Sequence, residues 1–230
     1  MRRGANLKRP PVVTIDGPAA AGKSTVAREL ARRLGFTLVD TGALYRALAW
    51  AVREAGASVD DLPAVSKVLD RTTVNLEGAR VVVNGRDVTA ELRTPELAML
   101  TSKLTRLQIV RDKLTPLQRR LARAGGVVLE GRDTGSVVCP DADVKFYLDA
   151  DLDERARRRS HELAATGLPA DFDTVKADVM QRDRQDMERA LAPLVRPEGA
   201  LVLDSTALSP EAVVERMLDA VEQARCCTRS

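Results

Sequence analysis

The chain has 230 residues, of which 44% are hydrophobic and 30% charged, and its 36 basic and 33 acidic residues leave a net charge of only +3. This length supports one core, or one core with a small inserted lobe. The near balance of charge argues against a protein that binds nucleic acid through phosphates, because such proteins usually carry a stronger basic excess. Three cysteines without a C-x-x-C pair, together with one histidine, argue against a disulfide framework and a zinc site.

The amino-terminal segment is basic, but no long apolar run follows it. The first apolar stretch, residues 12–15, is too short for a signal peptide or a membrane span. We therefore expect a cytoplasmic protein and a monomer, with neither a membrane nor a nucleic-acid partner.

Short apolar runs rich in β-branched residues alternate with helical stretches along most of the chain. The apolar runs predict five strands, at residues 12–16, 36–40, 126–130, 144–150 and 200–204. Helices are predicted at residues 24–34, 45–54, 151–165, 173–189 and from Ser209 onward. Five apolar strands separated by helices predict an α/β fold, with a parallel sheet flanked by helices on both faces.

One segment breaks this alternation. Residues 72–88 read TTVNLEGARVVVNGRDV, with turn signals at Gly78 and Gly85 between short β runs. This spacing predicts a small antiparallel meander, flanked by helices at residues 62–69 and 95–107. The expected parts of this single domain are a core at about 12–60 and 110–225 and an inserted lobe at about 62–108.

A glycine-rich loop follows the first predicted strand. It reads GPAAAGKS and fits G-x-x-x-x-G-K-[ST] between a strand and a helix, the pattern of P-loop NTPase folds. Glycines let successive backbone N–H groups converge on phosphate oxygens at a helix N-terminus. Lys23 supplies positive charge toward the β- and γ-phosphates, and the Ser24 hydroxyl can bind Mg²⁺. The predicted nucleoside triphosphate site consists of Gly17, Pro18, Ala19, Ala20, Ala21, Gly22, Lys23, Ser24 and Thr25.

The loop alone does not identify the reaction, because GTPases, helicase motors and small-molecule kinases share it. A kinase for a small acceptor needs arginines where the donor and acceptor phosphates meet, since those phosphates repel each other. Two polar segments, DTGALYR (40–46) and EGRDTG (130–135), follow predicted strands at the sheet edge where ligands bind. Two helical faces add charge, with solvated surface ion pairing as the open alternative: Arg182, Asp186 and Arg189, and Arg155, Arg158 and Arg159.

Taken together, the segments DGPAAAGKST, DTGALYR, EGRDTGSVVCPDAD, RARRR, RDRQDMERALAPL and ALVLDST stand in an order that resembles the bacterial cytidylate kinases. The resemblance extends from about Val12 to about Leu218. It implies ATP as the phosphoryl donor, with Mg²⁺, and CMP or dCMP as the acceptor. It also accounts for the meander, as part of an enlarged lobe that binds the nucleoside monophosphate, and implies a helical lid at about 155–185. The family often has Gly-Lys-Gly-Thr where this loop has Gly-Lys-Ser-Thr, the commoner P-loop form.

The resemblance also implies roles for individual residues. Arg46, Arg132 and Arg189 would hold the acceptor phosphate, near Thr41. Ser102, Arg111 and Asp133 would recognise the cytosine ring, and Arg182 and Asp186 the ribose. The expected catalytic group, part of it on the lid, consists of Lys23, Arg132, Arg158, Arg159 and Arg184.

Two alternatives to CMP phosphorylation remain open at this point. The nearer one is a kinase for UMP or for a metabolite such as shikimate. A site built on a carboxylate such as Asp133 would reject uracil, which offers a carbonyl where cytosine has an amino group. The more distant alternative is a nucleotide-gated regulator or a nucleic-acid-binding ATPase, which would need a basic stripe and base-stacking aromatics. Only three Phe, two Tyr and one Trp are present, which disfavours it.

Overall fold

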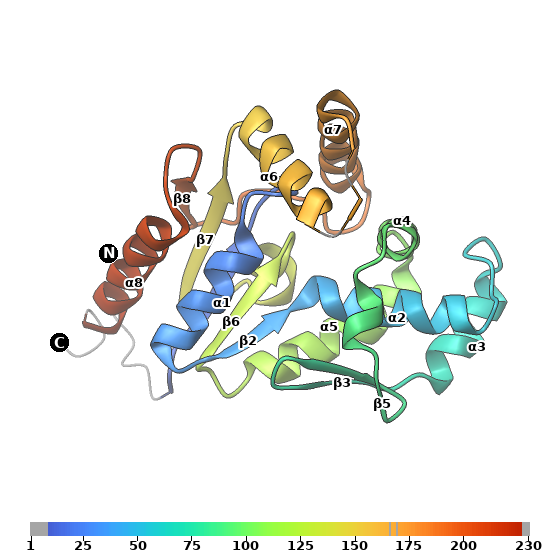
Figure 1. Ribbon diagram of the computed structural model, residues 1–230. Coiled ribbons are helices and arrows are strands. Elements are labelled where there is room, and N and C mark those ends of the chain that lie inside the picture. The colour runs from blue at the N-terminus through green and yellow to red at the C-terminus, as the bar shows by residue number, and fades with distance from the viewer. Residues whose placement is uncertain (1–8, 166, 169, 227–230) are drawn as a thin grey trace.

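A five-stranded parallel sheet forms the centre of the computed structural model, which describes residues 9–165, 167–168 and 170–226. The strands lie in the order β2-β6-β1-β7-β8, and Figure 1 labels all of them except β1. Their bounds are Val12–Asp16 for β1, Thr37–Asp40 for β2, Val127–Gly131 for β6, Val144–Asp149 for β7 and Leu201–Asp204 for β8. The predicted five-stranded parallel sheet is therefore confirmed.

Alternating side chains of the central strands face two separate layers of helices. Val13 and Ile15 of β1 pack with α1 (Lys23–Leu34) and α8 (Pro210–Cys226). Val12, together with Val127 and Leu129 of β6, packs in the opposite cluster, with α2 (Thr41–Glu54) and α5 (Gln108–Ala122). Apolar residues on both faces thus bury the central strands β1 and β6, as their composition predicts, whereas Leu201 and Val202 of the edge strand β8 are 49% and 46% exposed.

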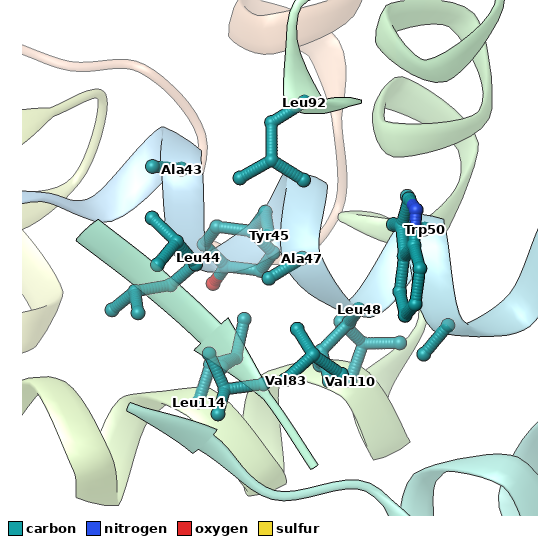
Figure 2. Packing of buried hydrophobic residues seen from close by; sticks show 14 of the residues in the cluster. Ala43, Leu44, Tyr45, Ala47, Leu48, Trp50, Val83, Leu92, Val110 and Leu114 are labelled. Carbon is teal, nitrogen blue, oxygen red and sulfur yellow. The ribbon is translucent and has the colours of Figure 1, made fainter. Parts of the chain in front are cut away.

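The segment between α2 and α5 forms a separate lobe. Its three-stranded antiparallel sheet consists of β3 (Val74–Glu77), β4 (Arg80–Val83) and β5 (Arg86–Asp87), which confirms the predicted meander. The neighbouring helices are α3 (Leu62–Arg71), the 3₁₀ turn η1 (Thr89–Leu92) and α4 (Pro95–Leu104). Figure 2 shows the side chains of α2 meeting this lobe and α5, with Leu44, Tyr45 and Leu48 near Val83, Leu92, Val110 and Leu114.

Two helices differ from the sequence expectation. Helix α2 begins at Thr41 and not at Tyr45, because the Asp40 side chain accepts a hydrogen bond from the Ala43 N–H and caps the helix four residues earlier. Helix α5 has no predicted bounds at all. Pro116 lies inside it, which obscures the helical pattern in the sequence.

The polar edge of the sheet is covered by two helices. Figure 1 shows α6 (Leu152–Ala165) and α7 (Phe172–Glu188) beyond the carboxyl end of β7. At the end of β6, a short π-helical turn (η2, Thr134–Val138) leads the chain away from the sheet. In the part of the chain that the structure describes, no helix is long and apolar enough to cross a membrane.

Candidate active site

The glycine-rich loop joins β1 to α1 in a conformation that its glycines make possible. Gly17 has φ +152°, and a Cβ atom there would lie 1.9 Å from the backbone oxygen of Leu148. Gly22 caps α1 with φ +90°, so helix α1 begins at Lys23 and points its N-terminus into the loop. A loop closed in this way presents its N–H groups and the positive end of the helix to an anion.

Lys23 is buried inside this loop. Its Nζ donates a hydrogen bond to the Pro18 carbonyl oxygen at 2.6 Å. Burial, and then the positive charge of Arg132, lower the pKa of Lys23 to about 7, while Glu130 opposes the shift. An anion bound in the loop would reverse this effect, because it would favour the charged amine.

Glu130, at the end of β6, lies opposite the start of α1. The Ser24 hydroxyl donates to Glu130 Oε1 at 2.6 Å, and the Thr41 hydroxyl donates to the Glu130 backbone oxygen at 2.7 Å. Burial, and then repulsion from Asp40, raise the pKa of the Glu130 carboxyl. Glu130 is not among the site residues predicted from the sequence. Its position at the end of a buried strand that pairs with β1 was the available signal.

The side-chain oxygen atoms at the start of α1 and the end of β6 are suited to binding a magnesium ion. Mg²⁺ prefers oxygen ligands and typically takes one or two from protein carboxylates, completing its shell with substrate phosphates and water. Ser24 supplies a hydroxyl. Glu130 supplies a buried carboxylate, which is repelled by the negative charge of Asp40. Among the described residues, no cluster of three or more His, Cys, Asp or Glu side chains is placed to hold a metal ion. The donor set therefore fits Mg²⁺ that arrives with phosphate ligands.

A second group of charges lies around the carboxyl end of β6. Arg132 Nε donates to Asp186 Oδ2 at 2.9 Å. Arg189 lies 3.5 Å from a carboxylate oxygen of Asp186 and 3.5 Å from one of Asp133. These contacts bring α7 and the chain after it onto the loop that follows β6. Because Arg132 and Asp186 also act on the charge of Lys23, this group borders the glycine-rich loop.

Asp133 joins this group to helix α5. Its Oδ2 accepts a hydrogen bond from Arg111 Nη1 at 2.8 Å, and both side chains are buried. The Nη2 atom of Arg111 is buried without a hydrogen-bond partner in the protein. The guanidinium also lies 5.8 Å from the centre of the Tyr45 ring. This region therefore combines a flat aromatic side chain, a carboxylate and a spare N–H donor, which suits a polar planar ligand.

Asp16, the last residue of β1, holds the loop that carries Arg132 and Asp133. Its carboxylate accepts from the Thr134 N–H and hydroxyl, each at 2.8 Å, and from the Gly135 N–H at 2.7 Å. Burial raises the pKa of Asp16 although these hydrogen bonds lower it. The strand that begins the glycine-rich loop thus also fixes the opposite wall of the site.

Other expected site residues lie nearby with different partners. Arg46 pairs with Asp40 at 2.9 Å, and Ser102 donates to Gln185 of α7 at 3.0 Å. Withdrawal from water, and then repulsion from Arg132, lower the pKa of Arg182 to about 10, although the residue is exposed in part. Arg46 and Arg159 add to that repulsion.

The three arginines expected on the lid, Arg158, Arg159 and Arg184, lie in different places and have different partners. Arg158 binds the Ala21 and Ser205 backbone oxygens, at 3.3 and 2.7 Å. Arg159 pairs with Glu162, and Arg184 is 76% exposed and pairs with Glu188. The structure therefore places Arg158 against the glycine-rich loop but does not bring Arg184 to the site.

A phosphate-binding loop on a doubly covered parallel sheet, opposed by paired arginines and carboxylates, defines the chain as a P-loop kinase. The family model for cytidylate kinase matches residues 13–223. The chain belongs to the cytidylate kinase family. It is 48% identical over 216 residues to a cytidylate kinase of Geobacter sulfurreducens, covering 92% of this chain and 93% of that protein.

Further similarities agree with this placement. The cytidylate kinase of Symbiobacterium thermophilum is 46% identical over 212 residues, covering 90% of this chain and 94% of its own length. A crystal structure of an uncharacterised protein from Eubacterium ventriosum shares 11% sequence identity, with a TM-score of 0.52, and covers 94% of this chain and 99% of its own. This last likeness is one of fold alone.

Proposed function

We propose that the protein transfers the γ-phosphoryl group of ATP to CMP and dCMP, giving CDP and dCDP. One observation carries the proposal: Arg132–Asp186 and Arg111–Asp133 lie around the end of β6, bordering the loop that holds Lys23. The first pair is suited to an acceptor phosphate and ribose, and the second to a cytosine ring. The relatives named cytidylate kinase, similar over nearly the whole chain, support the same acceptor.

The reaction proposed is a direct in-line transfer. An oxygen of the acceptor's 5′-phosphate attacks the γ-phosphorus, and the bond from that phosphorus to the ADP oxygen breaks. The attacking oxygen is already anionic, so neither a covalent intermediate nor a general base is required. The protein aligns the two nucleotides and offsets their repulsion. In this proposal Lys23 and the loop of residues 17–25 hold ATP, while Arg46, Arg132 and Arg189 hold the acceptor phosphate.

The acceptor base is recognised by groups on three elements. Asp133 accepts from the exocyclic amine of cytosine, Arg111 donates toward O2 and N3, and the Ser102 hydroxyl adds a further contact. Arg182 and Asp186 bind the ribose, and Thr41 lies beside the acceptor phosphate. Uracil presents a carbonyl oxygen in place of the amine, so a buried carboxylate would repel it and remain unpaired.

Two parts of the chain would move around bound nucleotides. The lobe at about 62–108 would close on the acceptor, and a lid at about 155–185 would close on the transferring group and exclude water. Arg158 and Arg159 belong to this lid. Arg184 would have to leave Glu188 and turn inward to take part. We further propose that the protein acts as a monomer in the cytoplasm.

Magnesium would be held with ATP by the Ser24 hydroxyl and the Glu130 carboxylate. The ion, when bound, supplies positive charge that offsets the charge of the triphosphate. The chain's own residues then orient the phosphates: the Lys23 amine replaces its contact with Pro18 by one to the nucleotide.

The test is a coupled assay of ADP release across nucleoside monophosphates at matched concentration. CMP and dCMP should give the highest kcat/KM, and Lys23→Ala should remove most of the turnover. A preference for UMP, or equal use of all acceptors, would overturn the assignment of Asp133. A Lys23→Ala protein with normal turnover would refute the role of that lysine. The assay also includes shikimate, to test the alternative that the acceptor is not a nucleotide.

A further inference from the structure

The backbone N–H and carbonyl oxygen of Ala19, in the glycine-rich loop, are both bound by side chains of the α6–α7 pair. The Ala19 N–H donates to Asp183 Oδ1 of α7 at 2.8 Å. The Ala19 carbonyl oxygen accepts from Arg155 Nη1 of α6 at 3.1 Å. Arg155 and Asp183 also form an ion pair with each other, so the two side chains and the Ala19 backbone close a ring of polar contacts.

This ring is buried and carries no solvent-exposed member. Arg155 is 8% exposed and Asp183 and Ala19 are each 5% exposed. Arg155 Nε donates in addition to the Ala150 carbonyl oxygen at 2.9 Å, which fixes the start of α6. The Ala19 methyl group packs against Val175 and Val179 of α7. Every group of Ala19 is therefore in contact with the α6–α7 pair.

The same helix contacts the acceptor side. Asp186, one turn after Asp183, accepts from Arg132 at 2.9 Å, and Gln185 accepts from Ser102 of α4 at 3.0 Å. Helix α7 thus has a donor-side contact at Asp183 and acceptor-side contacts two and three residues later. A rigid helix that touches two sites and binds differently when either is filled makes their occupancies interdependent.

We propose that Asp183 and Arg155 are positioning residues that tie the phosphate loop to α7 and thereby couple ATP binding to acceptor binding. This inference rests on the proposed function, because it takes the loop as the donor site and the arginine group as the acceptor site. Neither residue has to touch a nucleotide. Their effect passes through the Ala19 backbone on one side and through Asp186 and Gln185 on the other.

The experiment measures binding of CMP by calorimetry with and without the Mg²⁺ complex of β,γ-imido-ATP. The ratio of the two dissociation constants is the coupling factor, typically about 5- to 150-fold for coupled sites. In Asp183→Asn the shape is kept, but the charge that binds Arg155 is lost. We expect the coupling factor to fall toward one and the affinity for the ATP analogue to fall about tenfold, since a hydrogen bond to a charged group contributes that much.

Two further variants make the result specific. Asp178→Asn makes the same chemical change at an exposed position of α7 and should alter neither quantity. Arg155→Lys keeps the charge but cannot reach all three oxygens of its present partners, so it should lower the coupling factor to an intermediate value. Thermal melting of each protein shows how much of it is folded. A merely structural pair would lower the melting temperature and leave the coupling factor of the folded fraction unchanged.

Several outcomes would overturn the inference. These are a wild-type coupling factor of one, a coupling factor that survives in Asp183→Asn, an equal loss in Asp178→Asn, or failure of both Asp183→Asn and Arg155→Lys to fold. The proposed function is judged separately, by wild-type turnover across acceptors. If another acceptor is preferred there, the binding measurements use that acceptor and the coupling inference is still decided.

Discussion

Arg111 and Asp133 form an ion pair at 2.8 Å whose side chains are only 6% and 7% exposed. The pair joins α5 to the loop after β6, and it lies beside Arg189, which approaches the other carboxylate oxygen. Removing one member of a buried pair leaves the other charge unpaired, which costs more than the pair itself contributes. The site is therefore also a point on which the stability of the fold depends.

Replacing Arg111 by methionine should lower the free energy of unfolding by roughly 3 kcal/mol or more, because Asp133 would lose its closest cation. Urea unfolding followed by circular dichroism measures this. The exposed Arg120 of the same helix provides the matched control, and Arg120→Met should change stability by less than about 0.5 kcal/mol. Equal effects of the two substitutions would contradict the importance of the buried pair.

Asp133→Asn should reduce the discrimination between CMP and UMP. An asparagine amide can donate to the uracil carbonyl, whereas the carboxylate can only accept. We expect the ratio of kcat/KM for CMP to that for UMP to fall at least about tenfold. Because both values come from one preparation, any loss of folded protein cancels in the ratio. An unchanged ratio would show that Asp133 does not face the base.

Binding of ATP at alkaline pH should take up a proton. The pKa of Lys23 is about 7, so at about pH 8 much of its amine is neutral. Triphosphate binding favours the charged amine and so raises the pKa of Lys23. At a pH above about 7, the complex therefore holds more protons than the free protein. Well below pH 7, both hold the same number, because the amine is charged in each. Calorimetry in buffers of different ionisation enthalpy measures the uptake.

Two comparisons make this measurement specific to the lysine. EDTA keeps metal ions from shifting the pKa of Glu130 in the same experiment. Lys23→Met should abolish the uptake, whereas an unchanged uptake in that variant would assign the proton to another group. At about pH 5 the wild-type protein should show no uptake by this residue, since its amine is already protonated.

Glu130→Gln should raise the concentration of Mg²⁺ needed for half-maximal activity by roughly 10- to 100-fold. The amide keeps an oxygen for Ser24 but removes the negative charge at the site that we propose for the ion. A titration of turnover against Mg²⁺ at fixed ATP measures this. Glu211→Gln, an exposed change in the first turn of α8, is the control. An unaltered Mg²⁺ requirement in Glu130→Gln would remove Glu130 from the proposed metal site.

The five parallel strands were predictable because each strand is a short apolar run bounded by turns or helices, whereas their order in the sheet was not predicted. The lobe was predictable for the same reason, since Gly78 and Gly85 mark its turns. Helix α5 was not, because Pro116 interrupts its pattern and its stability comes from packing against α2. Packing between distant segments leaves little trace in local sequence.

The placement of candidate site residues was predictable where a motif fixes their position, as in the loop around Lys23 and the segment after β6. Helical spacing was less informative. It places Arg155, Arg158 and Arg159 on one face, yet the first is buried against Ala19, the second binds Ser205 and the third pairs with Glu162. Spacing shows which side chains share a direction, but not what lies in that direction. Asp183 was overlooked because its partner is a backbone group more than 160 residues away.

The position of β6 between β1 and β2 has a consequence for synthesis of the protein. A nascent chain that has not yet reached Val127 contains the first two strands of the sheet but lacks the one that lies between them. While the lobe between α2 and α5 is being translated, β1 and β2 therefore have no partner strand between them, and their apolar faces and edges stay unpaired. Prematurely terminated products would therefore carry exposed strand edges, the feature that invites aggregation and capture by chaperones.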